Sequence, residues 1–264
     1  MSDDVTRDWL GQPSDTPRPD PMRAVREHGK PVLPKRFYEA AGVAEGEGGF
    51  RLTLDGRPAN TPARNPLAAP TLALAERLAA EWAAQGETID PSRMPVTRLV
   101  NTAIDGVAPR MGAVAEDLWT YAGTDLVAYR AATPERLVAA QADAWDPVVA
   151  WAHDALGVRL ILGEGVMHVD QPADTVAALR RAVSAIDDPF RLAALHTLTT
   201  LTGSLLIALA VLHGHLDADA AWDAAHVDET YQAAIWGADA DAASRLAFRK
   251  AEFVAAAEAA ALAG

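Results

Sequence analysis

The chain contains no cysteine among its 264 residues. This absence excludes disulfide bonds, thiolate nucleophiles, and zinc or iron–sulfur sites held by cysteine. Positive charge is also scarce, since 23 Lys and Arg face 36 Asp and Glu and leave a formal net charge of −13. Binding of nucleic acid or of anionic lipid through a broad basic surface is therefore disfavoured. A basic protein partner fits this charge better, unless the charge serves solubility alone.

The sequence also lacks a visible targeting segment and a long uninterrupted apolar run. Asp3, Asp4 and Asp8 stand where a secretory signal needs a basic region followed by apolar residues. Residues 192–212 carry no Asp, Glu, Lys or Arg, but polar side chains interrupt them: His196, Thr197, Thr199, Thr200, Thr202 and Ser204. This pattern favours a buried helix over a membrane span. We therefore expect no stable membrane insertion and a cytosolic location.

The residue pattern divides the chain into three segments. Residues 1–34 predict a flexible arm, because their prolines defeat helices and strands: Pro13, Pro17, Pro19, Pro21, Pro31 and Pro34. Residues 35–68 predict a β-rich domain, since apolar and polar residues alternate over 50–54 before the turn signal Asp55-Gly56. Apolar residues at helical spacing from 69 to 264 predict a larger helical domain. The predicted fold class is α+β.

No motif of known chemistry stands out. The sequence has no H-E-x-x-H, G-x-S-x-G or Walker loop. The run from His213 to Asp219 is the one local cluster with enough metal-ligand side chains. Its His and Gly residues suit a helix C-terminus, and Asp217 or Asp219 suits the N-cap of the next helix. We expect no metal or cofactor, while a metal-dependent hydrolase that uses this cluster remains an alternative.

A carboxylate between two indoles is the most informative local feature. The pattern predicts one helix over 217–237, in which Glu229 follows Trp222 by seven residues and precedes Trp236 by seven. Two heptads return to nearly the same stripe of a helix. A carboxylate on an interior face is costly without a partner, so the stripe is either a core network or a recognition surface. In a core network, Arg245 or Arg249 would supply the partner.

Several short segments together carry a resemblance to a known family, although each is weak alone. In order along the chain they are Lys35-Arg36-Phe37-Tyr38, Leu54-Asp55-Gly56-Arg57-Pro58, Thr61-Pro62, Glu81-Trp82, Gln85, Ile89-Asp90-Pro91, Met94-Pro95, Thr97-Arg98-Leu99, Asn101-Thr102-Ala103-Ile104-Asp105, Thr124-Asp125, Tyr129-Arg130, Trp145-Asp146-Pro147, Trp151, Glu229, Tyr231, Gln232 and Trp236-Gly237. With them the chain resembles the assembly chaperone family of the F-type ATP synthase catalytic head that handles the α subunit. The resemblance runs from about Lys35 to the end of the chain.

The resemblance implies a β-rich N-terminal domain, a larger helical domain and no catalytic activity. It implies that the chain holds the free α subunit through its nucleotide-binding domain until α pairs with β. The residues expected to contact this partner are Glu229, Trp222, Tyr231, Gln232 and Trp236. The lack of a visible presequence favours a bacterial cytoplasm over the mitochondrial matrix. A general acidic adaptor without a defined partner is a further alternative.

Overall fold

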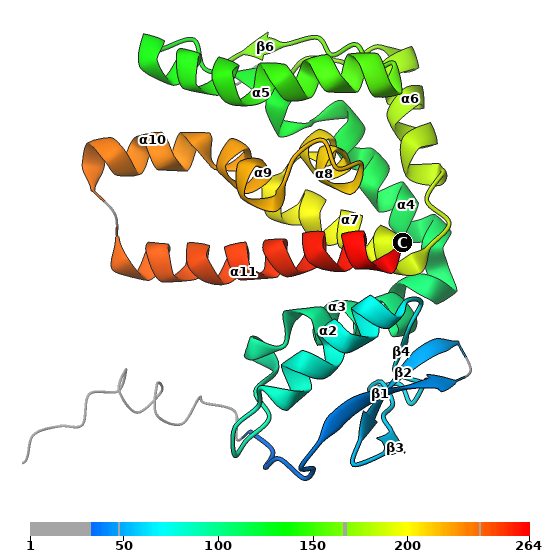
Figure 1. Cartoon of the computed structure of the whole chain (residues 1–264). Helices are drawn as coiled ribbons and strands as arrows, with labels where there is room; N and C mark the ends of the chain where they lie inside the picture. The colour runs from blue at the N-terminus through cyan, green and yellow to red at the C-terminus, as the bar shows by residue number, and fades with distance from the viewer. Residues whose placement is uncertain (1–32, 47, 166–167, 238) are drawn as a thin grey trace, which may run out of the picture. The chain divides into compact units, whose positions relative to one another are not determined.

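The structure is a computed structural model that describes residues 33–46, 48–165, 168–237 and 239–264 (Figure 1). Contacts divide the chain into two units, Met1–Pro34 and Lys35–Gly264. The predicted arm at 1–34 lies almost entirely outside the described residues. The fold that follows is that of the second unit.

A small antiparallel sheet opens this unit, with strand β2 at its centre. Its strands are β1 (Ala41–Gly46), β2 (Gly49–Leu54), β3 (Arg57–Pro58) and β4 (Ala68–Ala69). Strand β2 pairs with β1 on one side, with Ala41 opposite Leu54, and with β3 and β4 on the other. Asp55 and Gly56 turn between β2 and β3 with φ of 50° and 75°, as a tight hairpin turn requires. The predicted strand and turn are confirmed.

Helices dominate the rest of the unit. They are α2 (Leu72–Ala83), α3 (Pro95–Thr102), α4 (Met111–Trp119), α5 (Glu135–Leu156), α6 (Ala173–Ser184), α7 (Pro189–Thr202), α8 (Leu205–Leu212), α9 (Ala218–Ala225), α10 (Val227–Trp236) and α11 (Ala240–Ala263). A π-helical turn, η2 (Ala103–Val107), follows α3, and two short strands, β5 (Tyr129–Arg130) and β6 (Gly163–Glu164), pair in parallel. The predicted α+β class is confirmed.

The centre of the helical part is the pair α7 and α8. Residues 205–210 of α8 are fully buried, and α7 packs against α11 as well as α8. Gly203 separates the two helices with a φ of 72°, and the hydroxyl of Ser204 caps α8 by accepting from the amide of Ile207. Buried Asp125 accepts hydrogen bonds from Ser204 Oγ at 2.6 Å and from the amide of Leu206 at 3.0 Å. Among the described residues, no helix is long and apolar enough to cross a membrane.

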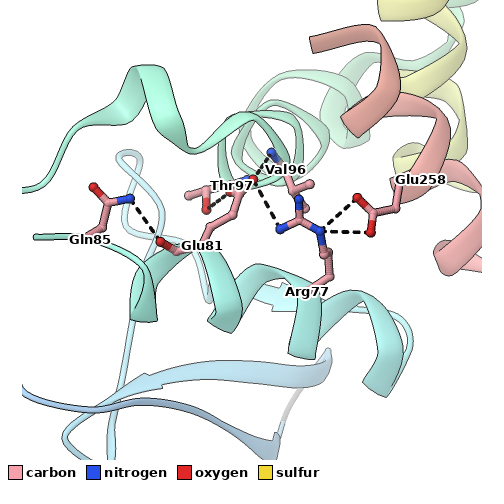
Figure 2. A network of polar contacts seen from close by, with 6 residues as sticks. All are labelled: Arg77, Glu81, Gln85, Val96, Thr97 and Glu258. Carbon is pink, nitrogen blue, oxygen red and sulfur yellow. Dashed lines mark hydrogen bonds and ion pairs between the residues drawn. The ribbon is translucent and has the colours of Figure 1, made fainter. Parts of the chain in front are cut away.

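Helix α2 lies against the sheet and is tied to α3 by buried polar contacts and to α11 by a partly exposed ion pair (Figure 2). Glu81 is 5% exposed and accepts from the amides of Val96 and Thr97 at 2.9 and 2.8 Å and from the Thr97 hydroxyl at 2.8 Å. It thereby caps the N-terminus of α3. Arg77 Nε lies 3.0 and 2.9 Å from the two carboxylate oxygens of Glu258 on α11.

This network bears on the predicted division of the unit at residue 68. The boundary falls inside β4, and α2 contacts the sheet as well as α3 and α11. The sheet and the helices therefore share contacts across it. The division into a β-rich domain at 35–68 and a helical domain at 69–264 stays a prediction.

Candidate functional site

The predicted single helix over 217–237 is wrong. Helix α9 ends at Ala225 and α10 begins at Val227, because His226 between them has φ −117° and ψ 26°, outside the helical region. The His226 ring stacks on Trp222 with 3.8 Å between ring centres, and its Nδ1 lies 2.9 Å from the Trp222 carbonyl oxygen. A break between the two helices removes the heptad relation between Trp222 and Glu229.

Trp222 belongs to the core. Its side chain is 4% exposed and packs against Phe253 of α11 with 5.5 Å between ring centres. Trp145 of α5 anchors the same helix by donating from Nε1 to the carbonyl oxygen of Ala224 at 2.6 Å. The expectation that Trp222 presents its indole to a partner is therefore contradicted, since the surrounding helices cover that side chain.

The second half of the predicted helix holds the site. Glu229, Gln232 and Trp236 lie on one face of α10, because spacings of three and four residues return to the same side of a helix. Together with α11 they line a groove of about 400 Å³, whose lining residues are Glu229, Gln232, Ala233, Trp236, Gly237, Asp239, Ala242, Ala243 and Leu246. The structure thus brings three of the five predicted contact residues together. Tyr231, which is half-buried, also lies on α10 but does not line this groove.

The groove belongs to a pair of helical segments that cover little of the core. None of the ten residues of α10, all of which the structure describes, is buried. Most side chains of α11 from Ala240 to Lys250 are exposed, and burial of this helix begins at Phe253. We call α10 and residues 239–250 the α10–α11 arm (Figure 1). Its exposed apolar side chains include Ile235, Trp236 and Phe248, which are 53%, 84% and 47% exposed.

Gly237 sets the geometry where α10 ends. Its φ of 86° and ψ of 155° fall in a region that only glycine occupies without strain. Further along the chain, Asp239 caps α11, accepting through Oδ1 from the amides of Asp241 and Ala242 at 2.8 and 3.4 Å. The glycine conformation thus ends α10, and the Asp239 cap begins α11 beside the groove.

The arm carries charged side chains of both signs: Asp228, Glu229, Asp239, Asp241, Arg245, Arg249 and Lys250. Asp228 accepts from Nε2 of buried Gln141 on α5 at 2.7 Å, which ties the base of α10 to the body of the unit. Glu229 is exposed and forms no ion pair or side-chain hydrogen bond with any residue the structure describes. Arg249 instead donates to the carbonyl oxygen of Leu201 at 2.7 Å. The core-network interpretation of Glu229 with Arg245 or Arg249 therefore finds no contact in the described part of the chain.

Comparison with known proteins identifies the family. A family model described as the ATP12 chaperone protein matches residues 35–153. The crystal structure of Atp12 from Paracoccus denitrificans is 44% identical, superposes with a TM-score of 0.81, and the match covers 88% of this chain and 99% of that one. The chain belongs to the ATP12 chaperone family. The predicted resemblance to the assembly chaperones of the F-type ATP synthase catalytic head is thereby confirmed.

Two further proteins are similar to this ATP12 family member. The Atu1473 protein from Agrobacterium tumefaciens is 48% identical in sequence, and its crystal structure superposes with a TM-score of 0.85. The match covers 94% of this chain and 92% of that one. Mitochondrial protein atp12 of Schizosaccharomyces pombe is 24% identical over 220 residues, which cover 79% of this chain and 75% of that protein. The residues matched by the family model end before α10 and α11, so they include the capping network but not the groove.

In this ATP12 family member the cluster from His213 to Asp219 lies at the junction between α8 and α9. Asp217 caps α9 by accepting from the amide of Ala220 at 2.8 Å, and Asp219 lies 2.7 Å from Lys250 Nζ. The His213 and His215 rings lie 5.7 and 5.3 Å from the Trp151 ring. Within the described ranges, no group of three His, Cys, Asp or Glu side chains is placed to hold a metal ion. The hydrolase alternative has no metal site among these residues.

Sequence reasoning missed the contribution of α11 to the groove. Ala242, Ala243 and Leu246 form its second wall, but they stand in an alanine-rich helix whose sequence does not show which part is covered. Gly237 after α10 and the N-cap residue Asp239 are the local signals that one helix ends and a new helix begins there.

Proposed function

We propose that this ATP12 family member is an assembly chaperone that holds the free α subunit of the F-type ATP synthase catalytic head. In this proposal the chain contacts the nucleotide-binding domain of α until the β subunit takes its place. Glu229, Tyr231, Gln232 and Trp236 of the α10–α11 arm make the contact. The chain acts in a bacterial cytoplasm, by binding alone and without catalysis or a cofactor.

The observation that carries the proposal is the exposure of Trp236, whose side chain is 84% exposed beside the groove between α10 and α11. An indole is among the side chains that contribute most to protein interfaces, and exposing one has no benefit for folding. A free subunit of an oligomer exposes apolar surface that aggregates unless another protein covers it. An arm that extends apolar side chains away from its own core is suited to that task.

The test measures holding and stability on the same preparations. Purified α subunit is diluted from denaturant with the wild-type chain or with Trp236→Ala, and aggregation is followed by light scattering. We expect the variant to lose most of its protective effect while its thermal unfolding stays within a few degrees of wild type. Phe37→Ala is the matched control, because Phe37 is also an exposed aromatic residue, at 72%, but lies before β1. A control that loses as much protection as Trp236→Ala would contradict the assignment.

A second measurement separates a dedicated chaperone from a general acidic adaptor. The tagged chain is recovered from extracts of the parent cell, and bound proteins are quantified with and without Glu229→Ala. We expect the α subunit to dominate and to fall with the variant. Recovery of many unrelated basic proteins, with α no more abundant than the rest, would favour the adaptor.

A further inference from the structure

We propose that the groove between α10 and α11 recognises an arginine side chain together with an adjacent apolar side chain on the surface of the client. This inference rests on the proposed function, because the client is the α subunit held by the arm. It adds the chemistry that selects the contact point. The occupant is a guanidinium group beside Trp236, with the neighbouring apolar side chain seated between the two helices.

The charge of the groove favours a cation. Its described lining residues include two carboxylates, Glu229 and Asp239, and no Lys, Arg or His. Glu229 has no hydrogen-bond or ion-pair partner among the described residues, and Asp239 uses only Oδ1 for its capping bonds, which leaves Oδ2 for a ligand. The nearby cations of α11 do not line the groove, since Arg249 binds the Leu201 carbonyl and Arg245 is exposed outside the lining. A cationic occupant would therefore meet carboxylates on both helices that form no ion pair with a described residue.

The shape and chemistry favour arginine over lysine. The exposed Trp236 indole offers a flat face on which a planar guanidinium can stack, and Glu229 offers two oxygens for paired hydrogen bonds. Gln232 adds an amide oxygen on the same face of α10. An ammonium group satisfies the charge but has no planar surface for the indole and no paired donors for the carboxylate.

The remainder of the lining favours an apolar neighbour. Ala233, Ala242 and Ala243 are small residues on facing helices, so they leave space that a larger side chain can fill. Leu246 and the Trp236 ring supply the apolar walls. Burying one large apolar side chain there adds favourable free energy without requiring a hydrogen bond. A volume of about 400 Å³ accommodates such side chains rather than a folded domain.

The test measures binding of purified α subunit to the full chain by titration calorimetry at several salt concentrations. Glu229→Gln and Asp239→Asn remove one charge each, and asparagine still caps a helix. We expect Glu229→Gln to weaken binding on the order of 30-fold or more, which is the range for breaking a desolvated charged contact. We expect Asp239→Asn to weaken it by a smaller factor, and both to flatten the salt dependence. Asp241→Asn is the matched control, since it lies in the same turn of α11 outside the lining, and its effect should stay below about threefold.

Arginine is identified by chemical protection. The α subunit is treated with phenylglyoxal, which modifies arginine, or with acetic anhydride, which modifies lysine, and mass spectrometry maps the sites. We expect one arginine of α to be protected in the wild-type complex. It should become reactive in the complex with Glu229→Gln formed at saturating concentration. Protection of a lysine alone would overturn the choice of arginine.

The outcomes separate this inference from the proposed function. If the wild-type chain binds α but the two groove variants behave like Asp241→Asn and no arginine is protected, the groove inference is wrong while the proposed function stands. If the wild-type chain does not bind α at all, the proposed function itself fails.

Discussion

Replacing Glu81 tests how strongly the buried capping network holds the unit together (Figure 2). Glu81→Ala removes the acceptor for three donors: the amides of Val96 and Thr97 and the Thr97 hydroxyl, all within 2.9 Å. The residue that precedes α3, Met94, makes no side-chain hydrogen bond to a described amide that could replace the cap. Glu81 is 5% exposed, so water does not readily substitute for the carboxylate.

The expected loss follows from two contributions. A lost helix cap costs about 0.5–2 kcal/mol, and each buried donor without a partner costs about 1–3 kcal/mol. Local relaxation gives some of these donors a new acceptor, so we expect Glu81→Ala to lower the free energy of unfolding by about 3–5 kcal/mol. For a unit of this size, that corresponds to a decrease in Tm of about 6 to 20 °C. Glu81→Gln keeps one acceptor and should cost about 1–3 kcal/mol.

The assay is urea unfolding followed by circular dichroism, with thermal unfolding as a second measurement. Arg77 pairs with both carboxylates, since its Nη1 also lies 3.6 Å from Glu81 Oε1. Glu258→Gln is therefore the matched control, because it removes the second carboxylate at a side chain that is 40% exposed. A partly exposed ion pair contributes little, so its loss should cost about 0.2–1 kcal/mol. If Glu81→Ala and Glu258→Gln destabilise the chain equally, the argument from burial and capping is refuted.

Three further predictions concern the arm, a buried carboxyl group and the histidine cluster. Gly237→Ala places a side chain at φ 86°, which costs about 1–3 kcal/mol locally and should weaken client holding in the light-scattering assay. Gly112→Ala is the control and should leave client holding unchanged, because Gly112 has a negative φ and no atom lies within 4 Å of its added Cβ. Burial raises the pKa of Asp125 from 3.8 to about 6, so protonation of this carboxyl group favours the folded state. The stabilisation by protonation, about 3 kcal/mol, is complete below pH 3.8 and is lost as the pH rises through 6. Asp125→Asn should abolish that part of the pH dependence in urea unfolding between pH 4 and 7, and an unchanged slope would contradict it. His213→Ala and His215→Ala should leave client holding intact. Weaker holding by these variants, together with holding by the wild-type chain that a chelator removes and added zinc restores, would revive the metal alternative.

Local signals in the sequence were sufficient wherever a feature depends on a few neighbouring residues. The Asp55-Gly56 turn, the cap at Asp217 and the apolar stripe of α2 all follow from backbone preferences and short-range hydrogen bonds. Residues 192–212, by contrast, do not form the single buried helix that their pattern favours, because Gly203 and Ser204 separate α7 from α8. The family resemblance depended on the order of such segments along the chain. The α+β class, the turn and the Asp217 cap were therefore predictable from the amino-acid sequence alone.

Only part of the candidate site was predictable, because only part of it depends on neighbouring residues. The seven-residue spacing from Glu229 to Trp236 holds, because α10 is continuous between them. The equal spacing back to Trp222 fails, because the stack of His226 on Trp222 goes with a non-helical backbone that no periodicity reveals. Whether Glu229 is buried also depends on distant helices, and these leave its side chain exposed.

Helix α11 shows the limit most clearly. Its sequence alone predicts a long alanine-rich helix, and the structure has one from Ala240 to Ala263. Ala247 and Ala251 are exposed, whereas Ala255 and Ala259 are buried, although all four are the same residue at four-residue spacing. The sequence determined that these residues are helical, because helix formation depends on local propensity. Only the tertiary structure decided which of them face a partner, because burial depends on whether α3, α7 and α9 reach that part of the helix.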